Sequence, residues 1–63
     1  MTKSEIVAAK LNNLLESNEL LLCNYSKQFV IRKGSVMKVD GNCLRVNGKG
    51  NAFLVGTFKA YVN

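Results

Sequence analysis

The sequence predicts an α+β fold, with an N-terminal amphipathic helix followed by a strongly bent, barrel-like antiparallel sheet of four to five strands. Three observations predict it. Apolar residues recur at helical spacing up to residue 17, they alternate with polar residues after residue 18, and glycines punctuate the alternating part. The 63 residues make a single domain, 1–63. A chain this short buries a marginal core, so we expect it to self-associate as a homo-oligomer.

The first element is a helix over residues 3–17. Thr2 and Glu5 have capping-box spacing, in which the hydroxyl accepts the N3 amide and the carboxylate reaches back to the cap amide. Asn18 is the expected stop, because Asn tolerates a left-handed backbone. The helix carries an apolar stripe that we interpret as core contact rather than as a partner or membrane face: Ile6, Val7, Ala8, Leu11, Leu14 and Leu15.

Two strands follow the helix, over residues 20–25 and 28–32. The run from Leu20 to Tyr25 is largely apolar without alternation, which is typical of a strand buried on both faces. Ser26 and Lys27 suit the turn between the two strands.

Residues 34–47 nearly repeat themselves, since GSVMKVD is followed by GNCLRVN. We interpret the repeat as two equal strands, 35–39 and 42–46, joined by a type I′ turn at Asp40-Gly41. This turn pairs Met37 with Leu44. A register shifted by one residue would instead place a cation among the apolar side chains.

The final strand is expected over residues 51–62, after a loop of residues 47–50 that lets Leu44 pair with Phe53. Its alternation changes parity at Gly56, and a bulge there would gather its apolar residues on one side. The strand contains no proline, and Lys59 is its only charged residue that would discourage pairing. It is therefore a natural edge for pairing with another subunit.

The face opposite the expected core is neither clearly polar nor clearly apolar. Its residues are Val36, Lys38, Cys43, Arg45, Ala52 and Leu54. A flat sheet covered by one helix would leave this face fully polar. The mixture favours a sheet that bends into a small barrel, or one that another subunit partly covers.

Composition argues against metal and cofactor sites. The chain has no histidine, and its two cysteines have no CxxC spacing. Cys23 and Cys43 lie in apolar stretches typical of reduced, buried thiols, although one disulfide between them is compatible with the sequence. The start is polar and no apolar run approaches the length of a bilayer span, so we expect a cytoplasmic protein without membrane contact.

The sequence also predicts that the protein is not an enzyme. It lacks the histidine that commonly acts as a base near neutral pH, and Glu16 and Glu19 suit solvated positions at the helix end. Ser35 and Lys38 fall on opposite faces of one strand. The glycines of residues 47–50 serve a turn between strands and do not precede a helix, as a phosphate-binding loop would.

Charge points to a polyanion. Residues 1–19 contain two lysines and three glutamates, a balance of −1, whereas residues 20–63 contain seven lysines and arginines and one aspartate, a balance of +6. Lys38 and Arg45 are the first candidates for phosphate contacts, and Tyr25 and Tyr61 are candidates for stacking on bases. The second group of candidate phosphate contacts lies at the expected turns: Lys27, Arg32, Lys33 and Lys49.

Two segments resemble the motifs of the Sm-like family, which includes Hfq, and together they cover about a quarter of the chain. Gly34-Ser-Val-Met-Lys-Val-Asp40 resembles the first motif and Gly56-Thr-Phe-Lys-Ala-Tyr-Val62 the second. The resemblance implies an SH3/Sm-like barrel in a ring whose subunits pair edge to edge, with uridine- or adenine-rich RNA at the pore near Asp40 and Asn42. The loop after Asp40 is shorter than the family's, and Val55 stands where the family often has Arg or Lys.

We therefore expect a small oligomeric nucleic-acid-binding protein that takes single-stranded RNA on a basic strand face. One alternative is a protein-interaction module, such as a viral or mobile-element inhibitor of a host factor, acting through a sheet edge or the helix. A binder of small anionic nucleotides would share the basic surface, and the sequence does not separate it from the first reading.

Overall fold

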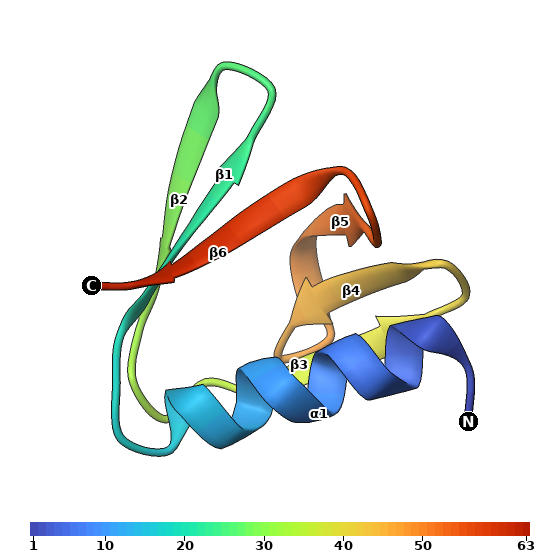
Figure 1. Ribbon diagram of the computed structural model, residues 1–63, viewed down its shortest axis with the longest axis horizontal. Helices are drawn as coiled ribbons and strands as arrows, with labels where there is room; N and C mark the ends of the chain where they lie inside the picture. The colour runs from blue at the N-terminus through green and yellow to red at the C-terminus, as the bar shows by residue number, and fades with distance from the viewer.

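The computed structural model describes residues 1–63 and contains one helix and six strands. In chain order these are α1 (Lys3–Leu15), β1 (Leu20–Asn24), β2 (Lys27–Ile31), β3 (Met37–Asp40), β4 (Cys43–Val46), β5 (Lys49–Leu54) and β6 (Phe58–Val62). The strands form two antiparallel three-stranded sheets with the orders β2-β1-β6 and β3-β4-β5. In Figure 1, α1 lies along one side of the molecule and the β1–β2 hairpin projects away from it. The predicted α+β class is confirmed.

The prediction of one continuous sheet of four to five strands is wrong, because the chain forms two sheets. The expected strand over residues 51–62 is divided into β5 and β6 by a turn at Gly56, whose φ is 99°. At this turn the Thr57 amide and hydroxyl both donate to the Leu54 carbonyl oxygen, at 3.2 and 2.8 Å. β6 then leaves β5 and pairs with β1, placing Ala60 opposite Leu22.

Helix α1 begins as predicted and ends earlier. Thr2 and Glu5 form the capping box: the Glu5 amide donates to the Thr2 hydroxyl at 3.2 Å, and the Thr2 amide donates to the Glu5 carboxylate at 3.0 Å. The helix stops at Leu15, and Asn18 closes its end by donating its backbone and side-chain amides to the Leu14 carbonyl oxygen, without a left-handed backbone. Neither the length nor the apolar character of α1 would let it cross a membrane.

The buried stripe of α1 is rotated from the expected one. Its buried residues are Ser4, Ala8, Leu11 and Leu15, whereas Ile6 and Leu14 are exposed. The helix turns this way because Asn12 is drawn to the edge of β3. The Met37 amide donates to the Asn12 side-chain oxygen at 2.6 Å, and the Asn12 side-chain nitrogen donates to the Met37 carbonyl oxygen at 3.1 Å. Asn12 thus takes the hydrogen-bonding place of a neighbouring strand.

The β1–β2 hairpin turns one residue earlier than predicted. Asn24 pairs with Lys27, so the two loop residues are Tyr25 and Ser26. Strand β1 is not buried on both faces: Leu20 and Leu22 are buried, but Leu21 and Cys23 on the other face are only half-buried. Sheet β2-β1-β6 therefore has one core face and one outward face.

The β3–β4 hairpin keeps the predicted faces with a shifted register. Asp40 pairs with Cys43, so the loop is Gly41-Asn42 and not Asp40-Gly41. Only Gly41 has a positive φ, 63°, which is the pattern of a type II′ turn. Met37 consequently lies opposite Val46, and the predicted pairing with Leu44 is wrong. The two-residue loop lies one residue further along the chain than predicted, so each residue of β3 pairs with a residue two positions further along β4. A shift of two residues leaves every side chain on its predicted face.

The type I′ turn is in the next hairpin, where Asn47 and Gly48 have φ angles of 54° and 73°. Val46 pairs with Lys49, and the register shifts between Arg45 and Val46, leaving Gly50 with a φ of 74° in the irregular part of β5. The predicted pairing of Leu44 with Phe53 is confirmed.

One hydrophobic core joins the helix to both sheets. Its buried residues are Ala8, Leu11, Leu15, Leu20, Leu22, Ile31, Met37, Leu44 and Phe53. The Phe53 ring bridges the sheets by edge-on contacts with Phe29 and Phe58, at centroid distances of 5.1 and 6.1 Å. Both cysteines are free thiols and half-buried. The two sheets therefore fold around a shared interior.

Candidate nucleic-acid interface

Lys38 and Arg45 form a basic face on the outward side of sheet β3-β4-β5, and Lys49 lies at the adjoining turn. Lys38 pairs directly across the strands with Arg45, and both alternate with buried neighbours, so they leave the core on the same side. Lys49 begins β5 at the Asn47-Gly48 turn. The two cations predicted as first candidates are therefore brought together. Lys49, from the second group, pairs with Val46 and not with this row.

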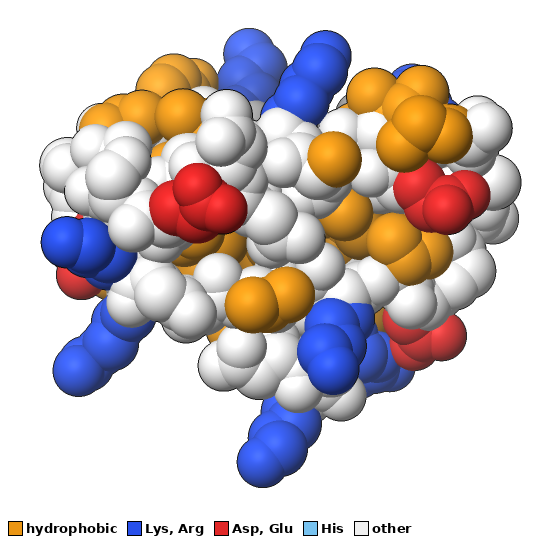
Figure 2. Space-filling model, turned by 90° about the horizontal axis from the view of Figure 1, so that it is seen from below, with side chains coloured by type: hydrophobic (Ala, Val, Ile, Leu, Met, Phe, Trp, Pro, Cys, Tyr) orange, Lys and Arg blue, Asp and Glu red, His pale blue; other side chains and the backbone are white.

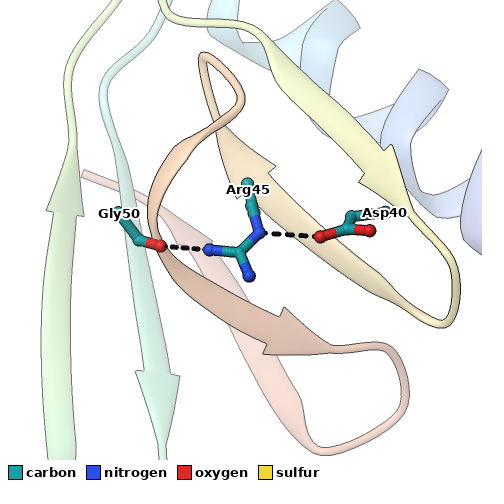
Figure 3. Close-up of polar contacts among 3 residues, drawn as sticks. All are labelled: Asp40, Arg45 and Gly50. Carbon is teal, nitrogen blue, oxygen red and sulfur yellow. Dashed lines mark hydrogen bonds and ion pairs between the residues drawn. The ribbon is translucent and has the colours of Figure 1, made fainter.

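Arg45 is held in place by two hydrogen bonds, drawn in Figure 3. Its Nε donates to Asp40 Oδ2 at 2.8 Å and its Nη1 donates to the Gly50 carbonyl oxygen at 2.6 Å. The third nitrogen of the guanidinium donates no hydrogen bond within the protein. A guanidinium has five N–H donors, so a fixed Arg45 still presents donors to solvent. Asp40 offsets part of its charge, which leaves Lys38 as the uncompensated cation of the basic face.

The Lys38 side chain lies along the turn that carries Lys49. A Cβ built on Gly48 would lie 3.5 Å from Lys38 Cδ, so the aliphatic stem packs over a residue that has no side chain. Two exposed ammonium groups at one turn suit a phosphate backbone, which positions such contacts without reading sequence.

A cavity of about 330 Å³ lies between the β1–β2 turn and β5, and we call it the tip cavity. Its walls are Asn24, Tyr25, Ser26, Lys27, Phe29, Asn51, Ala52 and Phe53. Phe29 and Phe53 give it an apolar floor, and the amides and Lys27 ring its rim. Ala52 also pairs with Arg45 across the strands, so the tip cavity adjoins the basic face directly.

Tyr25 stands at the tip cavity with an unusual backbone. Its φ is 53°, in the left-handed region that a bulky non-glycine residue rarely adopts, and it is 88% exposed. The equivalent positions of the other two hairpin turns hold Gly41 and Asn47, which adopt positive φ readily. The ring is therefore presented to solvent by a turn that a smaller residue would suit better.

Asn24, beside Tyr25, has a buried side-chain oxygen with no hydrogen-bond partner in the protein. Such orphaned acceptors are few in native proteins. Asn24, Ser26 and Asn51 were not among the residues predicted from the sequence. They could have been found by placing the first hairpin turn at Tyr25-Ser26. That turn puts Asn24 and Lys27 opposite each other at the tip of the hairpin.

Four predicted site residues lie away from the tip cavity and the basic face. Arg32 and Lys33 belong to the β2–β3 connection beside the end of α1, where the Gly34 amide donates to the Leu15 carbonyl oxygen at 2.8 Å. Tyr61 lies on the outward side of sheet β2-β1-β6, opposite Leu21. Figure 2 shows the helix side of the molecule, where cationic side chains project separately at the rim and form no single patch.

The fourth residue, Asn42, lines a smaller cavity of about 240 Å³ at the start of α1, together with Lys3, Ser4, Leu54 and Val55. Ser4 is 95% buried, from an exposed fraction of 5%. Glu5 follows Ser4 in the helix, and hydrogen bonds from the Thr2 backbone amide and hydroxyl hold the pKa of its carboxyl below its ordinary value. Asn42 therefore lies at the start of α1 and is not part of the basic face.

The structure brings together no group of side chains that could hold a metal ion. No three His, Cys, Asp or Glu residues converge. Glu19 is engaged with the chain end, where its carboxylate accepts from the Asn63 side-chain amide at 2.8 Å.

Comparison of the chain with protein-family models, with curated protein sequences and with solved structures found no match. The functional assignment therefore rests on the chain's own residues.

Proposed function

We propose that the protein binds single-stranded nucleic acid, RNA in preference to DNA, along the basic face and the tip cavity. One observation carries the proposal: Ala52 belongs both to the row of Lys38 and Arg45 and to the wall of the cavity that Tyr25 and Lys27 line. Phosphate-binding cations are thus contiguous with an exposed aromatic ring.

This combination fits a single strand better than a duplex. Proteins that bind single strands combine a cationic track for the backbone with aromatic rings on which unpaired bases stack. The bases of a duplex are already stacked, and the protein offers no free helix or strand pair that would enter a groove: α1 contributes Ala8, Leu11 and Leu15 to the core.

We further propose that the two sheets act as one bent, barrel-like unit and that the protein self-associates in the cytoplasm. The five residues Arg32–Val36 connect β2 to β3, so the strands follow the order of a single meander, β6-β1-β2 and then β3-β4-β5. β6 has a partner on one side only, which supports subunit pairing at that edge. Two free thiols suit a reducing compartment.

The test is titration of a fluorescent single-stranded oligoribonucleotide over a series of salt concentrations. Lys27, Lys38, Arg45 and Lys49 together predict a slope of about −3 for the logarithm of the affinity against the logarithm of salt. The same strand as DNA and as a duplex should bind more weakly. Absence of salt-sensitive binding at low ionic strength would reject the proposal.

The mass of the protein in solution, measured with and without nuclease treatment, tests self-association separately. A multiple of the 7.0 kDa chain mass that persists after nuclease treatment supports subunit pairing. A monomer in both preparations rejects it and leaves the nucleic-acid proposal standing.

A second candidate function is binding of a protein partner on the other sheet. Val30, Leu21 and Tyr61 form an outward row across β2, β1 and β6, and Val30 and Tyr61 are more than half exposed. Recovery of one stoichiometric protein from nuclease-treated lysate, lost in the variant Val30→Lys, would favour this function. Recovery of no protein would count against it.

A further inference from the structure

We propose that the tip cavity takes a single nucleobase, stacked on the Tyr25 ring and hydrogen-bonded to Asn24. The inference rests on the proposed nucleic-acid function and specifies its base-binding site. It follows from the shape of the cavity, the backbone of Tyr25 and the unpartnered oxygen of Asn24.

The dimensions and lining of the cavity suit one planar heterocycle. Its volume of about 330 Å³ is at the small end of the range for ligand cavities, so it holds one base with its sugar and not a run of bases. Phe29 and Phe53 supply an apolar floor, with their rings 79° apart. A floor of this kind excludes the charged phosphate and accepts an aromatic ring.

The backbone of Tyr25 indicates that its ring is kept for contact with a ligand. The left-handed φ of 53° is unfavourable for tyrosine, and an 88% exposed side chain gains little packing that would offset it. A ring in this position adds no core contact. It offers a free aromatic face at the cavity, on which any of the four bases stacks.

Asn24 is one of the polar residues that line the cavity. Its side-chain oxygen is buried and unpartnered, and therefore lacks a hydrogen-bond donor. Each nucleobase carries an N–H donor on its Watson–Crick edge, which is the edge read when a protein binds an unpaired base. The Asn51 amide across the cavity and the Ser26 hydroxyl at the turn give further contacts to the base edge or the ribose.

The bound nucleotide connects to the basic face through its phosphates. Lys27 lines the same cavity and pairs with Asn24 across the hairpin, so it lies beside the base site. On the other wall, Arg45 holds the Gly50 carbonyl oxygen next to Asn51. A strand that leaves the cavity over Ala52 reaches Arg45 and Lys38 without crossing an acidic residue other than the paired Asp40.

The decisive experiment compares wild type with Tyr25→Asn on probes that differ only in their bases. The probes are a fluorescent oligouridylate, a matching oligoadenylate and an abasic sugar-phosphate oligomer of the same length. Asn tolerates the left-handed backbone, so this variant removes the ring and keeps the turn. We expect Tyr25→Asn to bind both base-bearing probes about five- to 150-fold more weakly and the abasic oligomer as wild type does.

The chain also contains its own optical reporter of stacking. It has two tyrosines and no tryptophan, so in Tyr61→Phe the only emitting tyrosine is Tyr25. Tyr61 lies on the outward side of sheet β2-β1-β6, away from the cavity. We expect both oligonucleotides to quench Tyr25 emission and the abasic oligomer to leave it unchanged. Asn24→Ala should weaken the binding of the base-bearing probes by a smaller factor than Tyr25→Asn does.

The possible outcomes separate this inference from the proposed function. Salt-sensitive binding of all three probes with equal affinity, unchanged in Tyr25→Asn and without quenching, overturns the base site and leaves nucleic-acid binding intact. Absence of salt-sensitive binding by wild type rejects the proposed function itself. Quenching by free uridine or adenosine monophosphate supports the base site and identifies a small nucleotide as a sufficient ligand.

Discussion

The two sheets of this protein are built alike around their core and differ on their outward faces. Each has a central strand with a fully buried leucine, Leu22 in β1 and Leu44 in β4. The outward row next to Leu22 is Val30, Leu21 and Tyr61, whereas the outward row next to Leu44 is Lys38, Arg45 and Ala52. The inward faces determine the fold, so the outward faces are free to differ. One row is apolar and the other is basic.

The edges of the two sheets differ as well. Asn12 occupies the backbone groups of Met37 at the edge of β3, while β6 has no such cover. The helix therefore closes one side of sheet β3-β4-β5 and leaves sheet β2-β1-β6 open at β6 to another chain.

The largest expected effect comes from the two matched leucines. Leu22→Ala and Leu44→Ala should each lower the free energy of unfolding by about 2–5 kcal/mol, because each leaves a cavity in the shared core. Urea unfolding measures the loss, and amide hydrogen exchange locates it. Both substitutions should accelerate exchange in both sheets. If each variant affected only its own sheet, the core would not be shared.

Removal of the Asn12 amide should have the next largest effect. Asn12→Ala leaves the Met37 amide and carbonyl without their partner and should cost about 1–3 kcal/mol of unfolding free energy. Asn13→Ala is the matched control, because Asn13 is the exposed neighbour in the same helix. Equal losses in the two variants, measured by urea unfolding, would show that helix propensity and not the contact with β3 is responsible.

Tyr25→Asn should raise stability by up to about 1 kcal/mol, because Asn adopts a positive φ more readily than Tyr. The control is Tyr61→Asn, at a strand position with an ordinary φ, where the substitution should lower stability because Asn is a poor strand former. Thermal unfolding measures both. A loss of stability in Tyr25→Asn would mean that the ring packs in the fold and is not kept for a ligand.

Substitution of one lysine on each outward face tests whether nucleic acid binds to one sheet only. Lys38→Gln should weaken binding of an oligoribonucleotide and reduce the salt slope by about 0.7, whereas Lys59→Gln, on the other sheet, should change neither. Both substitutions lower the net charge equally. Identical effects would show that binding depends on overall charge and not on the basic face.

The smallest expected effect concerns the start of the helix. The folded-state pKa of Glu5 is below its ordinary value, because Thr2 donates hydrogen bonds to the carboxylate. The Glu5 carboxylate therefore contributes fully to the stability of the folded protein above its unfolded-state pKa, and this contribution is lost as pH falls through the folded-state pKa. Helix content followed by circular dichroism during acid titration should decline in this range, and Glu5→Gln should remove that part of the change.

The sequence predicted the local structure well where one physical rule decided it. The capping box at Thr2 and Glu5 follows from spacing alone. The faces of β3 and β4 survived an error in the turn, because a hairpin loop that moves along both strands does not change side-chain parity. The neighbouring positions of Lys38 and Arg45 were therefore predictable.

The division into two sheets was not predictable in the same way. Gly56 was expected to form a bulge, but a turn and a bulge have the same local signal, and the choice depends on β1 offering its free side to β6. The tip cavity was missed for a related reason. It is formed by a turn and by β5, which lie far apart in the chain, and only the packing of Phe29 against Phe53 brings them together.

The two free cysteines give this protein a built-in pair of chemical footprinting probes. Cys23 and Cys43 are half-buried on the outward sides of different sheets. Their rates of alkylation can be followed separately in one sample by peptide mass. Protection of Cys43 alone would report a ligand over the cationic sheet, and protection of Cys23 alone would report a contact on the apolar one.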